Sequence, residues 1–273
     1  MENIILRNLF RLVKAGGFHS DIEDIEPMSA FKWRKLCRVV HAQQLTYFFN
    51  EGARLCASQP NCNIPPSLLT VCQAEDRYEL PNFRKLASDL HLDVPILDKR
   101  LHNIIEGEIH AIDTSVETMT MLAIIVDTLN DMLNSGRVMH GVIHLGRYLR
   151  SVGDKTDFNK LDRWLNRLML RRMAQLQGSI LVSLFGFEPD EIPFLNRMEP
   201  SARMVALRSL DHSQHDVSGE WHFRQSATGM IHNNNAVLRR NLRRSICYIN
   251  YAPIETIGNF LSKFSHSLSE IEE

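Results

Sequence analysis

Apolar residues recur at helical spacing through most of the chain, and the longest such pattern covers residues 157–187. Its apolar positions follow the 3.6-residue turn, which predicts one long helix with one buried stripe. The stripe consists of Phe158, Leu161, Leu165, Leu168, Met169, Leu176, Ile180, Leu184 and Phe187. The other face carries basic residues that we expect to meet water or an anionic partner: Lys160, Arg163, Arg167, Arg171 and Arg172.

Caps and helix breakers predict further helices on both sides of this pattern. Gly16-Gly17 is expected to end a first helix over 3–15, and Ser29 to cap a second helix that runs on towards Cys56. Prolines at 65, 81 and 95 predict three helix starts. The remaining predicted helices cover 115–133, 138–151, 201–210, 236–251 and the stretch after Pro253.

Strand patterns are scarce, because no run of alternating β-branched residues is long enough to predict a sheet. We therefore predict an all-α fold, an irregular multi-helix bundle of about ten helices without a substantial sheet. Two regions are expected, 1–151 and 152–273, or one continuous domain. A polar loop is predicted at 211–235, where histidines, asparagines and glycines gather.

Composition narrows the class of protein. A chain of 273 residues can bury a large core, and 23% charged with 44% hydrophobic residues is ordinary for a globular protein. Five cysteines without CxxC spacing fit a reducing compartment, so a cytoplasmic location is expected. Charged residues interrupt every apolar window of about 18 residues, and Arg7, Arg11 and Lys14 interrupt the N-terminal one, so neither a membrane span nor a secretory signal is predicted.

Residue patterns that carry catalysis or bind metals are few. His140 and His144 stand one helical turn apart, but Gly141 occupies the place of the glutamate of an HExxH motif. The loop histidines 212, 215, 222 and 232, with Asp211 and Asp216, lack a tight ligand pair. GxSxG, GxGxxG and Walker patterns are missing. No catalytic residue, metal ligand or cofactor is therefore predicted.

A run of arginines is the strongest candidate for binding. It consists of Arg239, Arg240, Arg243 and Arg244, beside the apolar face of the helix predicted at 236–251. Such a helix suits acidic proteins, an anionic membrane surface or a phosphate-bearing ligand. Nucleic acid is not expected, because aromatic residues do not interleave with the arginines and the net charge is −1. A simple solvated face is the alternative.

Three stretches resemble a known family. They are LRNLFRLVKAGG with FKWRKLCRVVHAQQLTYFF near the start, residues 140–191, and LRRNLRRSICYINYAPIETIGNFL near the end. They are similar to the helical parts of the large bacterial nucleotidyltransferase family with the polymerase-beta-like fold, which is often found with polysaccharide-synthesis genes. Together they cover about half of the chain. The resemblance implies ancestry in the helical parts.

The catalytic unit of that family is not found in the sequence. The family needs a Gly-Ser at a strand end, followed by an Asp-x-Asp pair that holds magnesium, and residues 70–135 contain neither. Gly178-Ser179, followed by Glu188 and Asp190, has a similar order of residue types, but no strand is predicted before it. We therefore expect a non-catalytic helical protein that binds another protein. The alternative is a divergent nucleotidyltransferase or nucleotide-binding protein with an unrecognised site.

Overall fold

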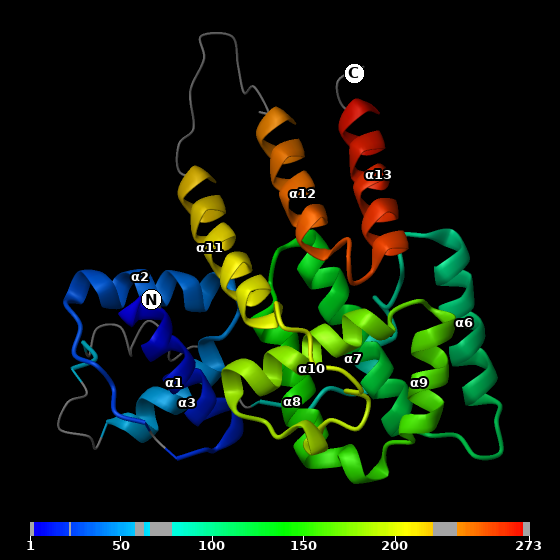
Figure 1. The fold of residues 1–273 in the computed structure, drawn as a ribbon, viewed down its shortest axis with the longest axis horizontal. Coiled ribbons are helices and arrows are strands. Elements are labelled where there is room, and N and C mark those ends of the chain that lie inside the picture. Colours follow the sequence, from blue (N-terminus) through cyan, green and yellow to red (C-terminus); the bar gives the residue numbers. More distant parts are fainter. Residues whose placement is uncertain (1–2, 22, 58–62, 66–77, 221–233, 270–273) are drawn as a thin grey trace.

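The computed structural model describes residues 3–21, 23–57, 63–65, 78–220 and 234–269, and they form helices joined by short connections (Figure 1). These residues contain no strand, which confirms the all-α prediction. The helices are α1 (Ile4–Phe18), α2 (Ala30–Ala42), α3 (Thr46–Cys56), α5 (Phe83–Leu86), α6 (Pro95–Ile109), α7 (Val116–Asn134), α8 (Met139–Val152), α9 (Phe158–Arg167), α10 (Arg171–Phe185), α11 (Ala202–Glu220), α12 (Asn234–Tyr248) and α13 (Pro253–Ser269). Short 3-10 turns lie at Gly153–Lys155 and Pro189–Glu191. The helix predicted after Pro65 lies outside the described residues.

Helix α7 lies at the centre of the bundle. Ser115 caps it as predicted, and every residue from Thr118 to Val126 is buried. Nine consecutive residues cover more than two helical turns, so burial extends around the whole circumference of this part of α7. Helices α5, α8, α9, α10 and α12 pack against α7. The sequence from Thr118 to Val126 contains no charged residue for this reason.

Helices α1 and α3 cross at two glycines. A Cβ atom on Gly16 would lie 2.0 Å from the carbonyl oxygen of Phe48, and one on Gly52 would lie 1.9 Å from that of Leu12. Only glycine permits such backbone contact. The prediction that Gly16-Gly17 ends the first helix is wrong, because α1 continues through both glycines to Phe18.

The single helix predicted over 157–187 is also wrong. The chain turns at Met169, whose φ is +58°, and this turn separates α9 from α10. The amide of Leu170 donates to the carbonyl of Leu165 (2.9 Å) and that of Met169 to Asn166 (3.1 Å), which is a Schellman motif without glycine. Leu165 and Leu170 are both buried, so their contact with the core favours the turn.

The same motif divides the helix predicted from Ser29 towards Cys56 into α2 and α3. Gln44 has φ +54°, the amide of Leu45 donates to Val40 (2.8 Å), and the amide of Gln44 donates to His41 (3.0 Å). Val40 and Leu45 are buried. Two of the longest predicted helices are therefore helix pairs joined by tight turns.

The prediction that Lys160 faces water or an anionic partner, with the other basic residues of 157–187, is wrong. Its side chain is buried, and its Nζ atom lies 2.9 Å from the carboxylates of both Glu108 and Asp113. Glu108 also accepts from the backbone amide of Ser115 at 2.7 Å. This buried ion pair joins the end of α6 and the start of α7 to α9.

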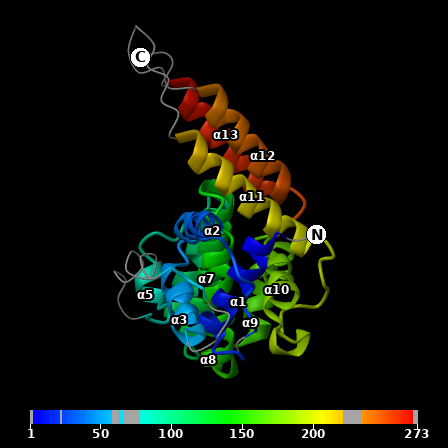
Figure 2. The ribbon, with the colours of Figure 1, turned by 90° about the vertical axis from the view of Figure 1, so that its left-hand side faces the viewer.

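Helices α11, α12 and α13 rise together out of the body of the molecule, and we call these three helices the arm (Figures 1 and 2). The polar loop predicted at 211–235 is wrong at both ends, because α11 extends to Glu220 and α12 begins at Asn234. Residues 221–233 lie outside the described residues. One cluster of buried side chains runs across residue 151, from Ile5 to Ala252, and the division into regions 1–151 and 152–273 stays a prediction.

Substituting Gly52 with alanine should test the contact between α1 and α3. The new methyl group would collide with the Leu12 carbonyl, so we expect Gly52→Ala to lower the free energy of unfolding by about 3 kcal/mol or more. Gly107→Ala is the matched control, since nothing lies within 4 Å of its added Cβ. Its better helix propensity should raise stability by about 0.5–1 kcal/mol. Urea denaturation measures both, and equal effects would contradict the role of Gly52.

Candidate functional site

The four arginines of the predicted site occupy α12 but face different surroundings. Arg239 and Arg243 are exposed, Arg240 is half-buried, and Arg244 is buried with 9% of its surface exposed. The structure therefore divides the predicted cluster into an outward pair and a pair that packs inward.

Arg244 is part of the fold because it caps the carboxyl end of α7. Its guanidinium donates to the carbonyl of Asn134 and lies against Gly136, where a Cβ atom would meet its Nε at 3.1 Å. Lys263 of α13 donates to the adjacent carbonyl of Leu133 at 3.0 Å. Helix carbonyls at this end have no partner within the helix and carry partial negative charge, so cations stabilise them. Burial, with Arg244 next, lowers the pKa of Lys263 to about 8.

The connection after α7 receives two further donors. The carbonyl of Gly136 accepts from the side-chain amide of Gln43 (3.2 Å) and from the hydroxyl of Ser209 (2.7 Å). The amide oxygen of Gln43 accepts from the first amides of α8, those of Val138 and Met139. The side chain of Gln43 thus hydrogen-bonds both to the connection that follows α7 and to the start of α8.

Helix α13 is fastened to the start of α6. The carboxylate of Glu255 accepts from the amides of Asp93 and Val94, which precede a helix with no side-chain cap of its own. Asn259 donates to Asp93 at 2.6 Å and to Asn134 at 2.8 Å. The base of the arm is therefore held by polar contacts of buried side chains, and its orientation is set by the body.

Apolar side chains remain exposed along α12 and α13. Their exposed fractions range from 38% to 63%, and they recur at helical spacing on two neighbouring helices. They are Leu242, Ile246 and Ile249 on α12 and Ile254, Ile257, Leu261 and Phe264 on α13. Together with Arg239 and Arg243 we call these residues the arm surface. The sequence indicates the apolar stripes. It does not indicate that, among the described residues, these side chains remain exposed.

A second polar cluster surrounds the two histidines of α8. The Nε2 atoms of His140 and His144 lie 3.1 Å apart, so one ring donates to the other, and Nδ1 of His144 lies 3.3 Å from the hydroxyl of Tyr78. The guanidinium of Arg147 lies 4.0 Å from the centre of the Tyr78 ring. Burial, and secondly the positive neighbours, lower the pKa of His144 to about 3, and burial lowers that of His140. Both rings are therefore neutral at pH 7.

Gly141, between these histidines, has a packing role. A Cβ atom there would lie 2.2 Å from Oγ1 of Thr128 on α7, so no glutamate could stand at this position without moving the helices apart. Within the described ranges, no three histidine, cysteine, aspartate or glutamate side chains gather as metal ligands would. His212 and His215 fall on α11, and His222 and His232 lie outside the described residues.

The Gly178-Ser179 pair lies within α10. The hydroxyl of Ser179 accepts from the buried amide of Glu199 at 2.9 Å, and Glu188 caps the short turn that contains Asp190. These residues connect α10 to the following segment and do not converge on a cleft.

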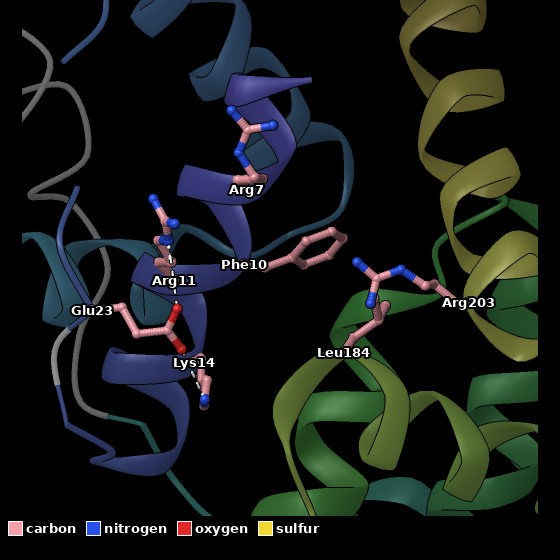
Figure 3. A pocket seen from close by; sticks show the side chains of 7 residues that line it. All are labelled: Arg7, Phe10, Arg11, Lys14, Glu23, Leu184 and Arg203. Atoms are coloured by element: carbon pink, nitrogen blue, oxygen red, sulfur yellow. Dashed lines mark hydrogen bonds and ion pairs between the residues drawn. The ribbon is translucent and has the colours of Figure 1, made fainter. Parts of the chain in front are cut away.

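A basic pocket lies between α1 on one side and the end of α10 and the start of α11 on the other (Figure 3). No sequence motif indicates it. Its volume is about 180 Å3, and Arg7, Phe10, Arg11, Lys14, Glu23, Leu184 and Arg203 line it. The three cations of α1 share one face because their spacing follows the helical turn. Only the fold brings Arg203 opposite them.

No family model matches the chain, and no curated protein and no solved structure shows significant similarity to it. The resemblance to nucleotidyltransferases therefore stays a prediction from the sequence. No helix among the described residues has both the length and the apolar character needed to cross a bilayer.

Substitution of neighbouring arginines should separate the inward from the outward side chains of α12. We expect Arg244→Met to lower the free energy of unfolding by about 1.5–3 kcal/mol, because the carbonyl of Asn134 loses a charged donor. Arg243→Met, on the adjacent exposed position, should change stability by no more than about 0.5 kcal/mol. Chemical denaturation of both variants measures the difference, and equal stabilities would contradict the capping role.

Acid should destabilise the protein through the histidine pair. Unfolded histidines bind protons near pH 6.5, whereas the lowered pKa values of the folded pair shift proton binding to more acidic pH, so stability is complete above about pH 6.5 and decreases as the pH falls below it. His144→Phe removes one such group. Between pH 6 and 5 the slope of unfolding free energy against pH should become smaller by up to about 1.4 kcal/mol per pH unit.

The exposed His110→Phe variant is the control, and its slope should match that of the wild type. Urea denaturation at a series of pH values gives the three slopes. A wild-type slope in the His144→Phe variant would show that the pair does not carry this dependence.

Proposed function

We propose that this chain is a non-catalytic interaction protein that binds an acidic, amphipathic segment of another protein through the arm surface. The observation that carries the proposal is the coincidence of exposed apolar stripes and exposed guanidinium groups on two neighbouring helices that project from the body (Figure 2). Large contiguous apolar patches are rare on monomeric proteins, and those that occur commonly mark interaction sites.

The geometry favours a helix as the bound segment. Helices α12 and α13 run antiparallel along the arm (Figure 1), and two such helices offer a long surface on which an amphipathic helix can lay its apolar face. Arg239 and Arg243 lie one turn apart at the side of the apolar stripe of α12, where they can pair with carboxylates of the partner. Apolar contact would supply affinity and the arginines would set orientation.

Two other partners fit less well. Membrane-surface helices carry many basic residues beside their apolar face, whereas Arg240 and Arg244 pack inward and leave two exposed arginines on the described part of α12. Single-stranded nucleic acid is bound on aromatic platforms, and the described arm surface has Phe264 as its one aromatic member. The net charge of −1 also gives no overall attraction to either polyanion.

The structure of the middle of the chain supports a non-catalytic role. Residues 78–135 form α5, α6, α7 and their connections, without a strand on which an Asp-x-Asp pair could be aimed at one metal ion. Ancestry shared with nucleotidyltransferases, action in a bacterial cytoplasm and a link to polysaccharide synthesis are parts of the same proposal. They rest on the sequence resemblance and on the cysteine pattern.

Charge reversal on the arm should abolish partner binding. We expect Arg239→Glu with Arg243→Glu to reduce capture of the partner from a lysate of the native host by at least tenfold, because like charges then oppose each other across the interface. Ile246→Ser with Leu261→Ser should have a similar effect by removing apolar contact area. Quantitative mass spectrometry of the captured proteins gives the ratios.

The matched control reverses Arg34 and Arg38 of α2, which are exposed and also stand four residues apart. This control should retain the proteins that the arm variants lose. If the control loses the same proteins, the attraction is unspecific. If the arm variants retain every protein that the wild type captures, the proposal is wrong.

A further inference from the structure

The connection between α6 and α7 carries three large apolar side chains that are exposed. The exposed fractions of Ile109, Ile112 and Val116 are 52%, 108% and 50%. We call residues 106–117, which comprise the end of α6, the connection and the start of α7, the tip. Each of these three side chains leaves at least half of its surface open, so the tip can offer apolar area to a partner.

Hydrogen bonds order the tip. The hydroxyl of Thr114 lies 2.9 Å from the carbonyl oxygen of Glu108 and 2.7 Å from that of Ala111. The carboxylate of Glu108 accepts from the amide of Ser115 at 2.7 Å and lies 2.9 Å from Nζ of Lys160. A segment that is ordered before contact loses little conformational entropy when it binds.

Carboxylates surround the apolar side chains of the tip. Glu106 is exposed and Glu117 is half-buried, and neither carboxylate has a hydrogen bond or an ion pair among the described residues. Asp113 pairs with Lys160, yet 78% of its side chain is exposed. The hydrogen bond from Lys160 is the main cause of the lowered pKa of Asp113, and Arg163 is a further cause. The tip contains four carboxylates and no lysine or arginine of its own, so negative charge predominates.

The arm surface combines apolar side chains with the opposite charge. Helices α12 and α13 contain one carboxylate, that of Glu255, and it is buried. Arg239 and Arg243 are exposed and make no hydrogen bond or ion pair within the described part of the chain. The tip is therefore an acidic, apolar segment of the kind that the arm surface suits, and it belongs to this chain.

The tip and the arm of one molecule point in opposite directions. Glu255 at the start of α13 accepts from the amides of Asp93 and Val94, so α6 and α13 begin at the same place. Figure 1 shows α13 rising into the arm while α6 runs down to the opposite side of the body. The 15 residues of α6 carry the tip about 22 Å from this place. Contact between the tip and an arm surface therefore needs a second molecule.

We propose that the tip docks on the arm surface of a second copy of this chain. The proposal rests on the proposed function, since it uses the same arm surface, and it names a partner that would compete there with the other protein. The two surfaces in contact are different, so each molecule can join one neighbour through its tip and another through its arm. Such a contact builds open chains or a closed ring.

Sedimentation velocity of the full chain tests the proposal. The weight-average mass should rise by about half or more between about 5 and 200 μM, because a small contact gives weak association. Ile112→Asp should weaken this association by about tenfold or more, since it removes apolar contact area and the position is fully exposed in the fold. Phe31→Asp on α2 is the matched control, with 67% of Phe31 exposed, and should associate as the wild type does.

Two variants that fail to associate alone should pair when they are mixed. Ile112→Asp retains the arm surface, and Arg239→Glu with Arg243→Glu retains the tip. Each should sediment as a monomer by itself. An equimolar mixture should form a one-to-one complex that grows no further, because one intact tip and one intact arm surface remain to each pair.

A wild type that stays monomeric throughout, or a mixture of the two variants that stays monomeric, would overturn the proposal. Undiminished association of Ile112→Asp would also overturn it and would indicate contact between two arm surfaces. Ile112→Asp should still capture the proteins that the wild type captures from the host lysate. Capture without self-association would remove this proposal and leave the proposed function in place, whereas self-association without capture would remove the other protein as a partner.

Discussion

The carboxyl end of α7 is the point on which the arrangement of this protein depends. A helix buried around its circumference needs neighbours on every side, and its last carbonyls still need donors from outside the helix. Gln43, Ser209, Arg244 and Lys263 supply these donors to the end of α7 and the connection after it. These donors come from the α2–α3 turn and from each of the three helices of the arm. Their hydrogen bonds to this one region therefore position the turn and all three helices.

This constraint also explains why one arginine run has two roles. Arg239 and Arg243 are at the solvent-facing side of α12, while Arg244 is directed to α7 by the same helical turn that exposes its neighbour. A sequence cannot distinguish a capping arginine from a partner-binding arginine when both stand in RRNLRR. The distinction depends on where another helix ends, which only the tertiary structure defines.

Local chemistry predicted much of the helical structure, and long-range packing accounts for the rest. Ser115 and Pro95 mark helix starts that the structure confirms. The turns at Gln44 and Met169 were missed because they adopt a left-handed conformation without glycine, stabilised by buried leucines on the far side of each turn. The prediction that the glycines of α1 end the helix was wrong, because the sequence does not indicate their close contact with α3. The pocket was missed for a related reason, because Arg203 is distant from α1 in the chain.

The pocket and the arm have a common structural basis in α11. Ser201, directly before α11, is hydrogen-bonded to Tyr251 in the connection between α12 and α13 (2.5 Å), and the middle of α11 is tied to Gly136 by Ser209. Arg203 lies between these two attachment points. The start of α11, which carries Arg203, is therefore held by contacts to the same two connections that hold the base of the arm.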